Sequence, residues 1–131
     1  MSVTLDRPYD DVLAGTRIAL AAQGFGVLTE IDVRATMKAK LGVDVPSQVI
    51  LGACRPELAH RALTATPSIG ALLPCNVVVR AEPGGHTVVE AIDPEAMARM
   101  EDSPVVRDVA DEARNRLRAA LDTLATPTEE D

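Results

Sequence analysis

Aromatic side chains are almost absent from this sequence. It contains no Trp, one Tyr and one Phe in 131 residues, although 47% of the residues are hydrophobic. The core must therefore be built from aliphatic side chains, and platforms on which bases or sugars could stack are lacking. A chain of this length is close to the commonest size of one domain and can bury a core without disulfide bonds.

Positive charge is also in short supply. The chain has 13 Lys and Arg against 20 Asp and Glu, which gives a formal net charge of −7. Because neutralisation of phosphates provides much of the affinity for nucleic acids, this balance predicts no nucleic-acid partner. The basic residues between Arg99 and Arg118 are interleaved with acids, so they indicate a solvated helix face of mixed charge rather than a basic stripe.

Cysteines and long apolar runs are few. Cys54 and Cys75 are the two cysteines, too few for a disulfide framework in a domain of this size. No apolar stretch approaches the roughly 18 residues that a membrane span needs, and the first residues lack the pattern of a secretory signal. We therefore expect a cytoplasmic protein with free thiols and no membrane association.

Motifs of the common catalytic and nucleotide-binding sites are missing. Gly24-Phe25-Gly26 precedes a strand pattern instead of a helix, and the spacing of neither a dinucleotide fingerprint nor a P-loop occurs. The sequence also has no serine nucleophile elbow and no H-E-x-x-H zinc helix. It thus predicts no cofactor, and it favours binding over catalysis without deciding whether the protein is an enzyme.

The hydrophobic pattern predicts a single α+β domain over residues 1–125. Strand patterns cover Val3–Leu5, Gly26–Asp32, Gln48–Ala53, Cys75–Ala81 and Thr87–Ile92, and helix patterns separate most of them. The predicted order is β-α-β-α-β-α-β-β-α. This order indicates one mixed or mainly antiparallel sheet with helices packed on it. We expect the acidic tail, residues 126–131, to be disordered.

Capping residues and apolar stripes place the predicted helices. Asp32 can cap a short helix that carries Val33, Met37 and Leu41 at spacings of four. Ser103 and a first-turn proline begin a long C-terminal helix. Its apolar residues form a continuous stripe: Val106, Ala110, Ala113, Leu117, Leu121 and Leu124.

Alternation along one strand assigns its two faces. In the strand Gly26–Asp32, simple alternation places Val27, Thr29 and Ile31 on one face. The other face then carries Leu28 together with Glu30 and Asp32.

Four strings of residues occur in a fixed order along the chain. They are GFGVLTEIDV at 24–33, LGAC at 51–54, LLPCNVVV at 72–79 and AIDP at 91–94. In this order and at these separations they resemble the family known as domain of unknown function 302, over roughly residues 9–97. The resemblance implies a compact α+β domain of bacteria or archaea that forms homodimers and has no established reaction.

The sequence departs from this family at Arg55. The family more often has Asn between the Gly-Ala-Cys string and the following proline. Asn is a good helix N-cap and Arg is not, so any role of that Asn does not carry over to Arg55.

Cys54 and Cys75 are the first candidates for chemistry. Cys54 closes a predicted buried strand just before a helix that begins near Pro56, where backbone N–H groups would favour the reactive thiolate. If the strands that carry them are neighbours, the two cysteines could form a redox pair or half of a soft metal site. His60 and His86 are the histidines that could supplement them. The alternative is that both thiols pack as small apolar side chains.

Glu30, Asp32 and Asn76 complete the candidate ligand-binding or thiol site. If it is buried in mid-strand, Glu30 would have a raised pKa and could act as an acid or base, or it could pair with Lys38 or Arg80. Asp32 also fits a plain helix cap. Asn76 can donate and accept hydrogen bonds at the edge of a cleft, or it can satisfy a neighbouring turn.

Three functions stay open at this point. The first is a homodimeric ligand-binding or interaction module without catalysis, whose partners are a second copy and a small molecule. The second is a thiol-dependent small-molecule or redox protein that uses Cys54 and Cys75, with Glu30 and Asn76 lining the cleft. The third is a metal-binding protein that uses the same two cysteines.

Overall fold

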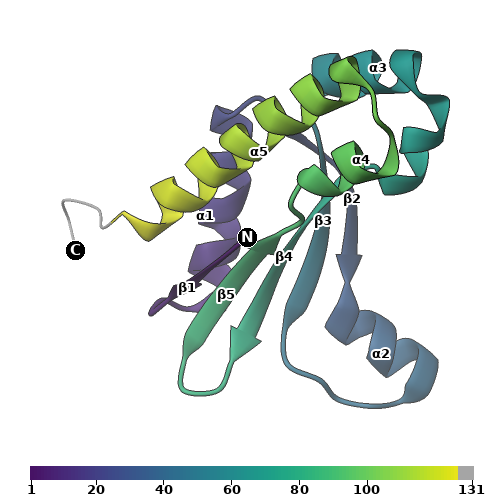
Figure 1. Ribbon diagram of the computed structural model, residues 1–131. Helices are drawn as coiled ribbons and strands as arrows, with labels where there is room; N and C mark the ends of the chain where they lie inside the picture. Colours follow the sequence, from purple (N-terminus) through teal and green to yellow (C-terminus); the bar gives the residue numbers. More distant parts are fainter. Residues whose placement is uncertain (127–131) are drawn as a thin grey trace.

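The computed structural model describes residues 1–126 (Figure 1). Of the predicted acidic tail, residues 127–131 therefore lie outside the described residues. The elements follow the predicted order, and the α+β class and the long C-terminal helix are confirmed. They are β1 (Ser2–Leu5), α1 (Tyr9–Ala22), β2 (Gly26–Asp32), α2 (Val33–Leu41), β3 (Gln48–Cys54), α3 (Pro56–Ala65), the 3-10 helix η1 (Pro67–Leu72), β4 (Cys75–Glu82), β5 (His86–Ala91), α4 (Glu95–Met100) and α5 (Pro104–Ala125).

The strands form one five-stranded sheet in the order β1-β5-β4-β3-β2, and every neighbouring pair is antiparallel. A tight turn joins β4 to β5, and in it Gly84 and Gly85 adopt φ values of 87° and 83°, which glycine alone enters readily. β1 pairs with β5 and forms one edge of the sheet, while β2 forms the other edge. β3 and β4 are therefore direct neighbours, with Ala53 opposite Cys75.

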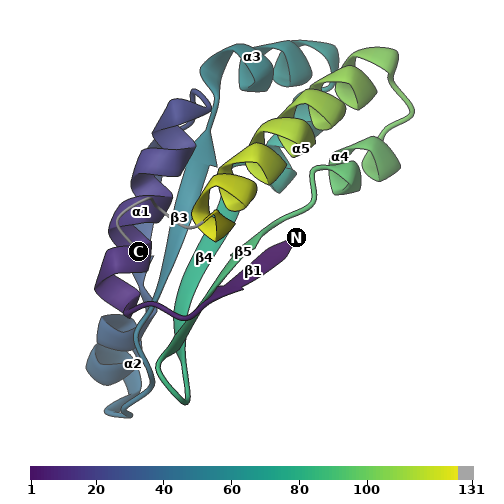
Figure 2. The same ribbon diagram turned by 90° about the vertical axis from the view of Figure 1, so that its left-hand side faces the viewer.

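Apart from α2, the α-helices form one layer over the sheet. In Figures 1 and 2, α1 and α5 lie across one face, while α3 and α4 pack with the first half of α5 near one end of the sheet. Every residue of the predicted apolar stripe on α5 is buried. The Ser103 hydroxyl caps this helix by accepting a hydrogen bond from the Val106 N–H at 3.4 Å. The aliphatic core consists of side chains from this helix layer and from the inward face of the sheet.

The faces of β2 differ from the predicted alternation. The pairing register shifts between Val27 and Thr29, because Leu28 is an extra residue in the strand. Val27 faces the helices, whereas Thr29 and Ile31 lie on the opposite face of the sheet. The prediction that these three residues share one face is therefore wrong. A pattern of strict alternation cannot anticipate a bulge, which reverses the side of every residue beyond it.

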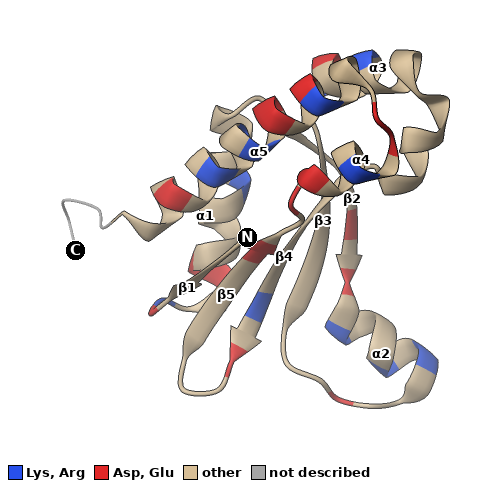
Figure 3. Cartoon of the chain, in the orientation of Figure 1, with Lys and Arg blue, Asp and Glu red and all other residues tan. Residues whose placement is uncertain are grey.

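Charges of both signs are mixed along the outer surface of α5 (Figure 3). Ion pairs join α5 to itself and to its neighbours: Arg116 with Glu112 at 3.1 Å, Arg114 with Asp93 at 3.2 Å and Asp108 with Arg61 at 2.9 Å. The predicted solvated face of mixed charge is thus observed. No helix in the described part of the chain combines the length and apolarity that a membrane crossing demands.

Candidate functional site

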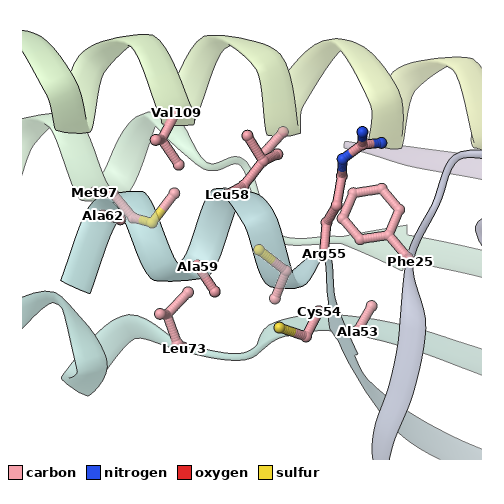
Figure 4. A pocket seen from close by; sticks show the side chains of 12 residues that line it. Phe25, Ala53, Cys54, Arg55, Leu58, Ala59, Ala62, Leu73, Met97 and Val109 are labelled. Carbon is pink, nitrogen blue, oxygen red and sulfur yellow. The ribbon is translucent and has the colours of Figure 1, made fainter. Parts of the chain in front are cut away.

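The end of β3 places both cysteines beside one cavity, which lies between α3, α5 and the sheet (Figure 4). Cys54 is the last residue of β3, and Cys75 is the first residue of the neighbouring β4. Both line this cavity, together with apolar side chains that include Phe25, Leu58 and Leu73. Both cysteine residues therefore border one cavity, as the sequence allowed if their strands were neighbours.

The cavity is small. Its free space measures ≈ 20 Å³, which is about the room that one water molecule needs. Pockets for drug-sized organic ligands enclose roughly 300 to 1,000 Å³. The cavity can therefore admit a single ion or water, but not an organic substrate of ordinary size.

The surroundings of the two thiols raise their pKa values. Desolvation raises the pKa of the buried Cys75 from 9.0 to about 11, and the nearby Cys54 adds to the shift. Desolvation and the Glu57 carboxylate raise the pKa of Cys54 as well. Burial and the Glu57 carboxylate, which both raise the pKa of Cys54, thus oppose the thiolate that its place at the start of α3 led us to expect.

Arg55 reaches across the corner between β3 and α3. As the sequence indicated, its side chain does not cap α3. Nη1 donates a hydrogen bond to the Gln23 carbonyl at 3.1 Å, and Nε lies 3.6 Å from Glu57 and 3.9 Å from Glu112. The buried Nε has no hydrogen-bond partner among the described residues. Arg55 thus ties the end of α1 to α3 and α5, and it is one of the residues that line the cavity.

Glu30 and Asp32 lie away from the cavity. The exposed Glu30 carboxylate accepts a hydrogen bond from Arg17 of α1, so its partner is neither of the bases that the sequence suggested. Its place on the helix side of β2 follows from the bulge, which puts it within reach of α1. Asp32 is a helix cap, as predicted, and Oδ1 accepts a hydrogen bond from the Ala35 N–H at 2.9 Å.

Asn76 lies on a different surface from the cysteine cavity. It is exposed and stands opposite Gly52, on the face of the sheet that α1 and α5 leave uncovered. The structure thus brings together Cys54 and Cys75 of the five candidate site residues, and it separates the other three from them. The sequence had grouped all five because alternation along one strand does not show which of its faces the helices cover, or how the faces of separate strands align.

Neither histidine lines the cavity beside the two cysteines. His60 is exposed on α3, and His86 lies at the start of β5 with Nδ1 3.7 Å from Asp6. Within residues 1–126, no group of three or more His, Cys, Asp or Glu side chains is placed to hold a metal ion.

The uncovered side of the sheet is a second candidate surface, which we call the open face. Ile31, Ile50 and Val78 form an apolar row across β2, β3 and β4. Next to this row, Arg80 forms ion pairs with Glu82 and, at 2.7 Å, with Glu90. A shallow hollow of ≈ 390 Å³ lies over β3, β4 and β5, and its wall includes Asn76, Val78, Arg80 and Ile92.

α2 borders the open face with an unburied apolar stripe. Val33 and Met37 share a second hollow, of ≈ 350 Å³, with Gln48 and Arg80 of the open face. Leu41, at the end of the stripe, is 68% exposed. None of the nine residues of α2 is buried. The stripe itself was visible in the sequence, but periodicity does not show whether anything packs against it.

Comparisons with known proteins agree with this fold. The model of the family described as "Domain of unknown function DUF302" matches residues 1–124. No curated protein matches the chain. A crystal structure of an uncharacterized conserved protein DUF302 from Bacillus stearothermophilus is similar, with a TM-score of 0.83 and 30% sequence identity over 93% of this chain and 94% of that chain. Neither match names a reaction, a ligand or a partner.

Proposed function

Because this chain belongs to the family of domain of unknown function DUF302, whose name carries no activity, we propose its function from its surfaces. It is a homodimeric interaction module without catalytic chemistry, in which two copies meet through α2 and the open face. The proposal takes residues 1–125 as one domain. The observation that carries it is the lack of any buried residue in α2.

A nine-residue helix that buries none of its residues fully is only marginally stable in water. Isolated helices shorter than about 12 to 15 residues are marginal, and helices in proteins gain most of their stability from an apolar face packed against a neighbour. α2 has such a face in Val33, Met37 and Leu41; within one chain Val33 and Met37 are only partly buried, and Leu41 is 68% exposed. A second chain that covers this stripe would supply the missing packing.

The open face supports a second copy as the occupant. A two-fold interface brings the same patch of both subunits together, so the patch must be complementary to itself. The apolar row of Ile31, Ile50 and Val78 can meet its own copy. Beside it, Arg80 stands between two acids, Glu82 and Glu90, so opposite charges can pair across the axis as well as within one chain.

Sedimentation equilibrium at micromolar concentration tests the proposal. Wild-type protein is expected to show twice the mass of the chain. Ile31→Asp places a carboxylate in the apolar row and should weaken dimerisation by at least roughly 100-fold, about 2.7 kcal/mol, because a buried unpaired charge is costly. Met37→Glu should act in the same direction.

Ile18→Asp is the matched control for these variants. Ile18 is 71% exposed on α1, on the helix side of the molecule, and lies outside the proposed interface. This variant should dimerise like the wild type. A wild-type chain that stays monomeric, or an Ile18→Asp variant as impaired as Ile31→Asp, would refute the proposal. Saturable binding of a small molecule to a monomer would instead make a ligand the occupant of the open face.

A second candidate function is a thiol-dependent protein that uses Cys54 and Cys75. The shared cavity favours it, since both thiols line one site. Labelling with iodoacetamide, followed residue by residue by mass spectrometry, tests this function. Rapid labelling of Cys54 near neutral pH would support it. The raised pKa of Cys54 leads us to expect slow labelling of the folded protein instead.

The cellular setting is part of the proposal. Both cysteines are free, and free thiols are typical of a reducing compartment. We therefore place the module in the cytoplasm of a bacterium or archaeon, as the family resemblance implies. Fractionation of a native host, with antibody detection of the chain, would test this location.

A further inference from the structure

Basic residues border the apolar stripe of α2 on both sides. With about 100° of rotation per residue, Lys40 lies beside Val33 on one border of the stripe, and Arg34 lies beside Leu41 on the other. The helix carries three basic residues and no acid (Figure 3). Because the whole chain has a net charge of −7, α2 is a basic element on an acidic molecule.

Lys40 is the base of α2 whose charge is left open. Lys38 forms an ion pair with Asp44 at 3.3 Å, and Arg34 donates a hydrogen bond to the Ser47 hydroxyl at 3.3 Å. Lys40 is exposed, and within residues 1–126 it takes part in no ion pair. Its ammonium group can therefore bind an acid of another chain without giving up a partner in its own.

The open face carries the complementary charge. Glu82 of β4 and Glu90 of β5 share one base, Arg80, so the three side chains together have one net negative charge. Both carboxylates are accessible, since the side chains of Glu82 and Glu90 are 34% and 45% exposed. A base from a second copy can thus approach them while Arg80 stays in place.

Charge also decides which elements of the two copies meet. Packing of the two α2 helices on each other would bring the bases of both copies together, and like charges repel at close range. Packing of α2 on the strands of the other copy brings its bases to the acids instead. Each copy then contributes one basic helix and one acidic strand pair, so the interface is complementary to itself.

We propose that α2 of each copy packs beside β4 and β5 of the other, where Lys40 forms ion pairs with the partner subunit's Glu82 and Glu90. This inference rests on the proposed dimer and adds which elements recognise each other in it. Ion pairs on an open surface contribute little to stability. Close charge pairs at an interface contribute more and select the correct partner.

Zero-length crosslinking with a carbodiimide tests this contact in the full-length chain. In a mixture of unlabelled and heavy-isotope-labelled protein, a crosslink between two copies joins one light and one heavy peptide. Mass spectrometry is expected to find such mixed pairs between Lys40 and Glu82 or Glu90. A dimer without these mixed pairs would overturn the inference and leave the proposed function standing. A monomeric wild type would overturn both.

Exchange of charges between two variants tests the same contact by sedimentation. Lys40→Glu and Glu90→Lys should each weaken dimerisation by roughly tenfold, which equals about 1.4 kcal/mol, because each places like charges at both contacts. An equal mixture of the two variants should dimerise like the wild type, because every contact in the mixed dimer again joins opposite charges.

Arg118→Glu is the matched control for Lys40→Glu. Arg118 is exposed on α5, on the helix side of the sheet, and its replacement makes the same change of charge. It should dimerise like the wild type. Equal dimerisation of Lys40→Glu and Arg118→Glu would overturn the inference, as would a mixture that dimerises no better than its components. Circular dichroism checks folding, and Lys40→Glu against Arg118→Glu still decides the result if Glu90→Lys does not fold.

Discussion

Gly52 is the glycine at which the structure leaves the least room for a side chain. It lies in β3 between Thr29 of β2 and Asn76 of β4, on the side of the sheet that Pro74 also approaches. A Cβ atom at this position would collide with the Thr29 side chain and would come within 2.8 Å of Pro74 Cγ. The glycine of the Leu-Gly-Ala-Cys string therefore lets Thr29 and Pro74 approach β3 closely.

Gly52→Ala is therefore expected to destabilise the fold. Forcing a methyl group into a filled site costs about 1 to 3 kcal/mol, and urea unfolding would measure the loss. Gly26→Ala, in the neighbouring strand, is the matched control, because the nearest atom to its added Cβ lies 3.9 Å away. Equal free energies of unfolding for the two variants would contradict this account. Adding Thr29→Ala to Gly52→Ala should recover part of the stability.

Two capped helices show how the same local motif has different consequences at the scale of an element. Ser103 caps α5, whose apolar stripe is buried along its whole length. Asp32 caps α2, which buries no residue. Loss of a cap costs about 1 kcal/mol of helix stability in either case. The cost reaches the whole fold only where the helix is part of the core.

The two caps thus predict different outcomes for two alanine variants. Ser103→Ala should lower the free energy of unfolding by about 1 kcal/mol and leave dimerisation unchanged. Asp32→Ala should leave unfolding of the monomer nearly unchanged but weaken dimerisation, because α2 frays and its stripe is no longer presented. Urea unfolding and sedimentation of both variants provide the measurements. The same loss of dimerisation in both would contradict the role given to α2.

The elements themselves were largely predictable from the sequence, because their signals are local. The caps at Asp32 and Ser103, the stripe of α5 and the turn at Gly84 and Gly85 all depend on residues a few positions apart. The bulge at Leu28 was not predictable, since it depends on how β2 pairs with β3. It explains why Glu30 reaches α1, a partner that the sequence analysis did not consider.

Strand order and the assembly of the candidate site lie at the scale of the whole molecule. The pairing of β1 with β5 joins residues at distant positions in the chain, and no local pattern encodes it. The sequence could state that Cys54 and Cys75 would meet if their strands were neighbours, but it could not show that they were. Nor could it show that Asn76 faces the other side of the sheet, or that Met97 and Arg55 line the cysteine cavity.

Because one helix layer covers only one face of the sheet, the two candidate sites lie on opposite sides of the molecule. The cysteine cavity lies beneath α3 and α5, which cover one side of the sheet in Figures 1 and 2. The open face lies on the other side and is bordered by α2. Dimerisation can therefore bury the open face without closing the cavity.

Hydrogen exchange of α2 at different protein concentrations tests the central proposal most directly. If a second copy covers this helix, the amides of residues 33–41 should exchange slowly when the protein is dimeric. They should exchange nearly as fast as an unfolded peptide after dilution below the dimerisation constant. The amides of α5, which packs within one chain, should be unaffected by dilution. Exchange in α2 that does not change with concentration would contradict the proposed dimer.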